Sequence, residues 1–568
     1  MLLSSKSRRI RLLLGIAFLL VLLAACSDSI PPAATPPPAS TATPRASATQ
    51  SPLPTGAPAI ATPISEKGGE FRQVLAQDAV SFHPFQTTDP ASALYQANVY
   101  ASGLWVRDPQ TLQPIPNMAE SWTISPDGKT YTFKLRPDLK WSDGKSLTAL
   151  DFQWTFEQAS KPANKYPYLE NLKDIVSYTA KDSATLEIVL KDAVCVGLTT
   201  VDAITPLPKH IWEKLDWHDP AKNPEIQNPS VVSGPFKLKE WQKDDHATFV
   251  RNDLFFRGAP NFDALTVRIV RDPSRQLQML QSGEVDMAPV GVDDYAPVGK
   301  WETIKAYNWE PAAATFDYLA FNFRRPLLQD VQVRRALAAA LPRQTIANGI
   351  FRGLAKPIYS MFPPANPMNN SEISRYDYNI DAAKATLQKA GYKWDASGNL
   401  LDKSGKRVRL RILFNTGNLQ HFQIASLART ELQKLGIDSE AAGLEFPAFL
   451  AFLRTEPFDY DLYVLGWRTP LDPYFTYQIW SEKTIPDLNS GAYVNKEIDK
   501  LFDQANRPPC DAESRKKVFA QIQKTIADDV PYIFLTHRAG YALINTRVVP
   551  NAPTALGINY YPEQWYIR

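Results

Sequence analysis

Residues 119–157 read AESWTISPDGKTYTFKLRPDLKWSDGKSLTALDFQWTFE and contain a turn followed by a strand. In the turn, residues 125–128, proline pre-sets φ and Gly128 accepts a positive φ. Apolar and polar side chains then alternate over residues 130–135, with an aromatic or aliphatic residue at every second position. This period of two predicts a strand with one buried face.

The same stretch ends in a capped helix. Thr148 can cap the helix, and Asp151, at the third helical position, can return a hydrogen bond to the backbone N–H of the cap. Phe152, Phe156 and Ala159 fall on one face of this helix. A strand, a turn and a capped helix form a structural core unit. Because no polar side chains converge here, we interpret the stretch as scaffold and not as a binding site.

This stretch resembles the signature segment of the extracytoplasmic solute-binding proteins, family 5. These are the peptide-, nickel- and oligosaccharide-binding subunits that serve ABC importers. The similarity rests on AESW, DGKTYTFKLR, WSDGKSLTALDF and the aromatic helix after them, and it continues in order through residues 68–568. The resemblance implies an α/β, two-lobed periplasmic-binding-protein (Venus-flytrap) fold of type II, cluster C, with an extra small domain in the N-terminal lobe.

The N-terminus is typical of an export signal. Four basic residues precede the apolar run 12–23, which is too short to cross a bilayer comfortably. The run ends in LAAC, which resembles a bacterial lipobox, so we expect residues 1–25 to be a signal peptide and Cys26 to carry a lipid. An ordinary signal peptide with a stray cysteine and a short membrane anchor are the alternatives.

Residues 27–64 are almost all proline, alanine, threonine and serine. Such a segment cannot bury enough apolar surface to offset its ordering entropy, and its proline density favours an extended, semi-stiff spacer. We therefore predict that residues 26–65 form a disordered tether, a role that overlaps with that of an O-glycosylated stalk. The tether would hold the body outside the cell membrane, in a periplasmic space or at the cell surface.

The remaining body is globular, because hydrophobic residues make up 44% of the chain and aromatic residues 11%. Without the four basic residues that precede Cys26, the formal net charge of +3 becomes −1. A nearly neutral body gives no electrostatic reason to expect nucleic acid as a partner. Cys195 and Cys510 lie far apart in the sequence, and this spacing favours two free, buried or partly buried thiols over a bridge.

The resemblance and the order of elements divide the body into two lobes. Residues 66–313 are expected to form lobe I, with a smaller subdomain near residues 106–205. Residues 314–536 are expected to form lobe II, in which the helix–strand–helix order indicates an α/β architecture. Residues 537–568 would then return the chain to lobe I.

The most informative polar-aromatic cluster is FDYDLYVLGWRTPLDPYFTYQIW, residues 458–480. Residues 460–465 predict a buried strand, and the following glycine–tryptophan step predicts a loop at its end, where α/β folds bind ligands. We therefore predict Trp467, Arg468 and Asp472 as ligand-binding residues. The alternatives are a core tryptophan, a surface cation and an aspartate that caps the next turn.

In peptide-binding relatives, an aspartate three residues beyond this tryptophan holds the α-amino group of the peptide. Here that position is Pro470, which cannot accept a salt bridge, and Asp472 lies two residues further on. Because this amine-binding aspartate is absent at position 470, oligosaccharides and other solutes are alternative ligands. On lobe I the resemblance places Thr88, Asp89 and Tyr166 in the cleft, although a helix start and loop packing would also explain these residues.

The sequence contains no HExxH, GxSxG, GxGxxG or CxxC motif, and its six histidines lack metal-ligand spacing. We therefore expect no catalysis, no metal and no cofactor. The predicted function is that of a monomeric, lipid-anchored receptor that captures a peptide-like solute between two lobes and delivers it to an ABC permease and ATPase. The same scaffold with an oligosaccharide, a tethered exported hydrolase and a binding lobe that reports to a sensor are the alternatives.

Overall fold

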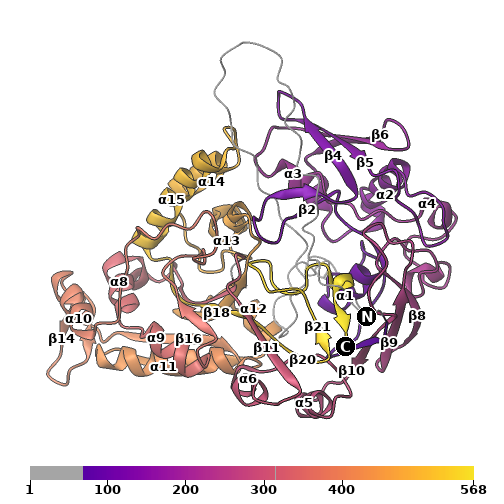
Figure 1. Ribbon diagram of the computed structural model, residues 1–568. Coiled ribbons are helices and arrows are strands. Elements are labelled where there is room, and N and C mark those ends of the chain that lie inside the picture. The colour runs from indigo at the N-terminus through magenta and orange to yellow at the C-terminus, as the bar shows by residue number, and fades with distance from the viewer. Residues whose placement is uncertain (1–67, 314) are drawn as a thin grey trace, which may run out of the picture.

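The computed structural model describes residues 68–313 and 315–568, which form two lobes (Figure 1). The predicted signal peptide, the lipid-attachment residue Cys26 and the tether lie outside these described residues. In the part of the chain that the structure describes, no helix is both long enough and apolar enough to span a bilayer.

A four-stranded sheet in the order β1-β10-β9-β8 forms the base of the first lobe. Its strands are β1 (Glu70–Leu75), β10 (Ala264–Ile269), β9 (His246–Arg251) and β8 (Phe236–Gln242). β1 runs parallel to β10, and the other neighbours are antiparallel. The helices of this part are α1 (Pro90–Val99), α5 (Pro273–Ser282) and α6 (Val292–Val298). Helix α5 ends at Gly283, whose φ is 76°.

A second four-stranded sheet, in the order β4-β5-β7-β6, contains the stretch 119–157. Its antiparallel strands are β4 (Ala119–Ile124), β5 (Thr130–Leu135), β7 (Thr185–Leu190) and β6 (Ile175–Ala180). The neighbouring elements are β2 (Trp105–Arg107), β3 (Pro114–Pro116), α2 (Ala149–Ala159), α3 (Gly197–Thr200) and α4 (Lys209–Trp212). Helix α2 packs on β6 and β7, so the sheet has one covered face.

The local predictions for this stretch are confirmed. Gly128 has a φ of 73°, and its N–H donates to Ser125 O at 2.8 Å. The alternate apolar residues of β5 are between 0% and 3% exposed. Thr148 N–H donates to the Asp151 carboxylate at 2.8 Å and closes the capping box at the start of α2. Each feature follows from residues within a few positions of one another.

The second lobe is built on a six-stranded sheet in the order β13-β19-β12-β18-β16-β17. Its strands are β13 (Ala355–Pro357), β19 (Tyr532–Arg538), β12 (Thr315–Phe321), β18 (Leu462–Arg468), β16 (Arg409–Asn415) and β17 (Asp438–Leu444). β16 runs parallel to β17 and β18, whereas β12 is antiparallel to both of its neighbours. This mixed sheet confirms the α/β character predicted for the second lobe.

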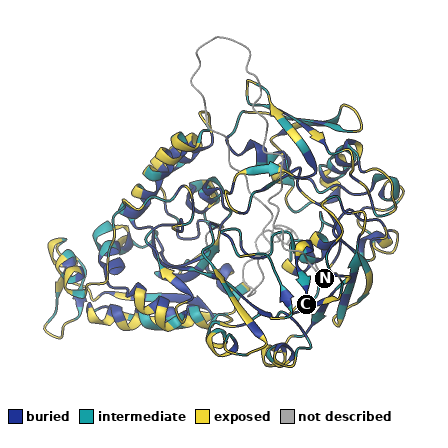
Figure 2. Ribbon diagram, in the orientation of Figure 1, coloured by how far each residue is buried: buried dark blue, intermediate teal, exposed yellow. Residues whose placement is uncertain are grey.

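Helices cover both faces of this sheet. One face packs on α8 (Val331–Ala339), α10 (Ile380–Lys389) and α11 (Leu419–Lys434). The other packs on α12 (Phe446–Arg454), α14 (Lys496–Ala505) and α15 (Ala512–Asp529). Figure 2 shows that the exposed residues gather on the outward faces of these helices, while the strands between them are largely buried. The lobes therefore have separate hydrophobic cores.

The chain crosses between the lobes at two adjacent places. In the first lobe β11 (Ile304–Trp309) pairs with β20 (Gly540–Asn545), and in the second lobe β12 pairs with β19. The segment that returns the chain to the first lobe is therefore two strands, β19 and β20, separated by Ala539. Gly540 lies directly against Trp309, since a Cβ at this glycine would come within 2.0 Å of the indole ring.

The prediction of two free thiols is wrong. Cys195 and Cys510 form a disulfide, with their Cα atoms 5.1 Å apart. The two residues are separated by 315 positions in the sequence, but folding places the segment before α3 next to the turn between α14 and α15. Sequence separation was a poor guide here because it does not limit the distance between residues of different lobes.

Candidate ligand-binding site

Strand β18 carries the predicted tryptophan to the rim of a pocket in the second lobe. The sequence predicted a loop from Gly466 onward, but the strand continues through Trp467 and ends at Arg468. The reason is the neighbouring strand β12, which runs antiparallel and pairs Phe316 with Trp467 and Thr315 with Arg468. The strand thus extends beyond the apolar run because its partner strand extends there too.

Gly466 lies close to a buried carboxylate. A Cβ at this position would lie 3.3 Å from Asp317 Oδ1. Arg538 donates to the two oxygens of Asp317 at 2.6 and 3.0 Å, and His421 Nε2 lies 3.3 Å from Oδ1. Burial acts to raise the pKa of Asp317, but Arg538 and His421 together hold it below its ordinary value. This cluster joins β12, β19 and α11 beside the end of β18 that carries Trp467.

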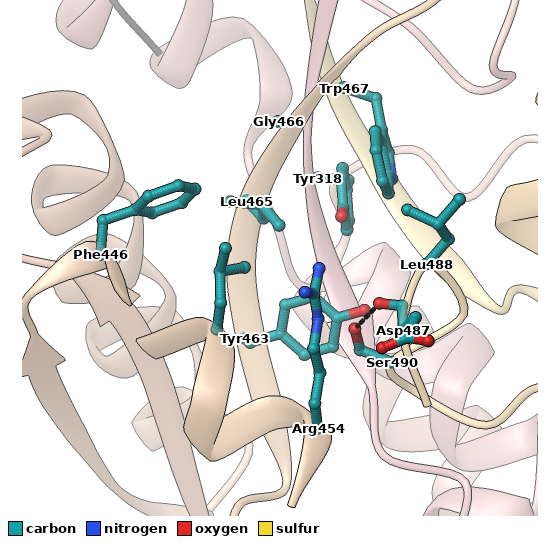
Figure 3. A pocket seen from close by; sticks show the side chains of 11 residues that line it. Tyr318, Phe446, Arg454, Tyr463, Leu465, Gly466, Trp467, Asp487, Leu488 and Ser490 are labelled. Atoms are coloured by element: carbon teal, nitrogen blue, oxygen red, sulfur yellow. Dashed lines mark hydrogen bonds between the residues drawn. The ribbon is translucent and has the colours of Figure 1, made fainter. Parts of the chain in front are cut away.

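Trp467 lines a pocket between β12, β18, α12 and the loop of residues 487–490 (Figure 3). Its apolar walls include Phe446, Leu450, Leu465 and Leu488, and its polar lining includes Tyr318, Arg454, Asp487 and Ser490. The free space is about 20 Å³, which is room for about one water-sized group. A ligand can therefore lie against Trp467, whereas deeper entry requires side chains to move.

Two donors at this pocket have no hydrogen-bond partner among the described residues. They are the indole N–H of Trp467 and Nε of Arg454, both of which are buried atoms. Burial lowers the pKa of Arg454, and the nearby Asp487 acts in the opposite direction. Because buried donors are normally satisfied, these two N–H groups are suited to donate hydrogen bonds to carbonyl or carboxylate oxygens of a bound molecule.

Asp472 is buried, and both of its oxygens are engaged. Arg515 Nη1 and Nη2 donate to them at 2.7 and 2.9 Å, and Tyr474 N–H donates to Oδ1 at 2.9 Å. Asp472 is the N-cap of the 3-10 turn η5 (Pro473–Thr476). The structure therefore gives Asp472 the capping role that the sequence left open, and a ligand amine could reach it only by displacing Arg515.

Arg515 was missed from the sequence, although a signal for it exists. It lies on the face of α15 that also carries Val518, Phe519 and Ile522, all of which are buried. A single arginine on an otherwise apolar helix face is costly unless an anion meets it. The sequence could have indicated a buried ion pair at Arg515, but it could not have named Asp472 as the partner.

The loop after Trp467 also touches the first lobe. Leu471 packs with Leu112 in a small apolar cluster. Arg107, on β2, is buried, and its Nη1 donates to Leu112 O at 2.7 Å. Burial lowers the pKa of Arg107 to about 10, while the carboxylate of Asp472 acts to raise it. The ion pair of the second lobe thus faces a cation of the first.

The three site residues predicted in the first lobe have local structural contacts. Asp89 caps α1, since its Oδ1 accepts a hydrogen bond from Ser92 N–H at 2.8 Å, and Thr88 is half-buried just before the helix. Tyr166 packs edge-on against Phe85 at 5.1 Å, and burial raises its pKa. In residues 68–313 and 315–568, no hydrogen bond or ring contact joins these three to the Trp467 pocket, so their ligand contacts stay predictions.

Comparison with known proteins places the chain in a family. The family described as bacterial extracellular solute-binding proteins, family 5 middle, matches residues 113–487. The oligopeptide-binding protein AppA of Bacillus subtilis is 27% identical over 518 residues, which are 88% of this chain and 92% of AppA. The dipeptide-binding protein of Escherichia coli is 26% identical over 475 residues, 79% of this chain and 86% of that protein.

Solved structures agree with this placement. AppA of Bacillus subtilis in complex with a nonapeptide has a TM-score of 0.71 at 27% identity and covers 89% of this chain and 99% of its own. CtaP of Listeria monocytogenes has a TM-score of 0.78 at 23% identity and covers 88% and 100%. The predicted two-lobed α/β fold of type II is thereby confirmed. The chain belongs to the bacterial extracellular solute-binding proteins of family 5, which serve transport systems and are not an enzyme family.

Proposed function

We propose that this protein captures a peptide between its two lobes and delivers it to an ABC permease. The observation that carries the proposal is the similarity to AppA, which was solved with a nonapeptide and superposes on 89% of this chain. Curated relatives that bind oligopeptides and dipeptides support it over most of their length. The oligosaccharide and hydrolase alternatives have no comparable support.

The mechanism follows from two separate cores joined by two short crossings. Each lobe moves as a unit, and the crossings on either side of Trp309 and Ala539 absorb the rotation. A peptide that contacts both lobes stabilises the closed arrangement through its greater affinity for it. The permease then recognises the closed arrangement, so side chains of the peptide need not be read in detail.

We propose that the amino terminus of the peptide is not bound by a carboxylate near Trp467. Pro470 has no side chain that could accept a hydrogen bond, and both carboxylate oxygens of Asp472 already accept hydrogen bonds from Arg515. The available groups are the indole of Trp467 and the guanidinium of Arg454, which suit an apolar side chain and main-chain oxygens. Peptides with free and with blocked amino termini are therefore both accepted at this position.

Uptake by cells tests the transport role. Cells that lack this protein are expected to lose uptake of radiolabelled peptide, and a plasmid copy of the gene is expected to restore it. Unchanged uptake, in cells shown to have no second peptide-binding protein, would contradict delivery to a permease. A sensor role would leave uptake intact while abolishing a transcriptional response to peptide.

We also propose that Cys26 carries the lipid that anchors the protein outside the cell. The support is the LAAC step followed by a proline-rich segment. A Cys26→Ser protein is expected to leave the membrane fraction or to remain an unprocessed precursor, as judged by fractionation and by its mass. A processed Cys26→Ser protein that stays with the membrane would show that another element anchors it.

A further inference from the structure

The disulfide between Cys195 and Cys510 joins the two lobes to one another. Cys195 lies just before α3 in the first lobe, and Cys510 lies between α14 and α15 in the second. In Figure 1, α3 and α14 stand at one end of the molecule, and the crossing strands β11 and β20 stand at the other. The lobes are thus connected by chain at one end and by a covalent bond at the opposite end.

Directly beside this bond, the hydrogen bonds that join the lobes go to a single residue. Cys195 N–H donates to Asn506 O at 3.0 Å, and Val196 N–H donates to Asn506 Oδ1 at 3.2 Å. Beside them lies a cavity of about 180 Å³ between the lobes. Its lining includes Asp174 and Asp192 from the first lobe and Tyr474, Asp503 and Arg507 from the second.

Most residues that line this cavity are polar or charged, so hydrophobic burial within it contributes little to holding the lobes together. The charged side chains that line it, Asp174, Asp192, Asp503 and Arg507, are exposed, and solvent screens their interactions. Asp192 also lies 3.8 Å from Lys129 of its own lobe, so it is not held by the second lobe. The disulfide is therefore the strongest restraint beside this cavity.

We propose that the Cys195–Cys510 bond is a latch that limits how far the two lobes open. Rotation about the crossings moves the opposite edges of the lobes most, and a disulfide keeps its two Cα atoms within about 7 Å of each other. With the bond intact, the edges at Cys195 and Cys510 cannot separate, so solute enters and leaves through a restricted opening. The inference rests on the two-lobed fold and does not depend on the identity of the solute.

A dithiol reductant opens the latch. One of its thiolates attacks a sulfur of the bridge and releases the other cysteine thiolate, which takes up a proton. The second thiol of the reductant then attacks the mixed disulfide and releases the second cysteine. Cys195 and Cys510 become thiols, and the dithiol becomes a cyclic disulfide, so two electrons pass from reductant to protein.

Small-angle X-ray scattering on the ligand-free mature protein tests the latch. Reduction with dithiothreitol, and separately the variant Cys195→Ser/Cys510→Ser, are expected to shift the radius of gyration to a larger value. The matched control is Asn506→Ala, which removes the hydrogen bond to Val196 N–H but keeps the disulfide; its radius is expected to stay that of the parent. Circular dichroism and a thermal melt establish that each sample is folded.

Equal radii for oxidised and reduced folded protein would overturn the latch. So would expansion of Asn506→Ala with its disulfide intact, because non-covalent contacts would then be the restraint. Loss of folded structure on both reduction and double substitution would show a bond that maintains the fold instead of limiting lobe movement, and would also overturn the proposal. Because no solute is present, these outcomes are independent of whether the protein binds peptides.

Discussion

Arg515→Met is expected to lower the free energy of unfolding by about 3–5 kcal/mol, because it leaves a buried carboxylate without its cation. The side chains of Arg515 and Asp472 are 1% and 0% exposed, and two hydrogen bonds join them. Arg515 Nε also donates to Ala505 O at 3.0 Å, so the substitution removes a link between α14 and α15 as well. Urea unfolding followed by circular dichroism measures the loss.

The partner substitution separates the charge from the packing. Asp472→Asn/Arg515→Met removes both charges, and its destabilisation is expected to be clearly smaller than the sum of the two single losses. If the free-energy losses of the two single substitutions add up to that of the double substitution, Arg515 and Asp472 do not stabilise each other. If Arg515→Met alone lowers the free energy of unfolding by less than about 1 kcal/mol, the pair contributes no more than an exposed salt bridge. Asp472 would then again be a candidate for contact with the ligand.

Trp467→Ala is expected to weaken ligand binding at least tenfold, which corresponds to about 1.4 kcal/mol. The indole lines the pocket of the second lobe and carries a buried N–H without a partner among the described residues. Removing it takes away both a stacking surface and a donor. Calorimetric titration with the ligand recovered from the protein gives the affinity, and a thermal melt of the same sample gives the stability.

A second tryptophan supplies the control for this experiment. Trp122 is also partly buried, but it packs on the core of the first lobe from strand β4. Trp122→Ala is expected to lower the melting temperature and leave the affinity unchanged. If Trp467→Ala behaves in the same way, Trp467 is a core residue, and the ligand site lies elsewhere between the lobes.

Local chemistry made part of the fold predictable from sequence. The turn at Gly128, the strand β5 and the capping box of Thr148 and Asp151 depend on residues that lie a few positions apart. Their dihedral preferences and hydrogen bonds are nearly the same in any tertiary setting. For this reason the structure of the stretch 119–157 could be predicted from its sequence alone.

The candidate site depended on contacts that the sequence does not encode locally. β18 runs to Arg468 because β12 lies beside it, and Asp472 is neutralised by a residue 43 positions away. The bond between Cys195 and Cys510 spans 315 positions. Such pairings are decided when whole elements pack, so sequence periodicity could place Trp467 near a strand end but could not state what surrounds it.

The identity of the solute that co-purifies with the protein shows whether the protein is a peptide receptor. The mature protein is purified without denaturation, its bound compound is released by acid, and that compound is identified by mass spectrometry and titrated back into emptied protein. A peptide receptor is expected to release one or more peptides that rebind with one molecule per protein. An oligosaccharide or another non-peptide solute that rebinds in the same ratio, with no peptide recovered, would contradict it.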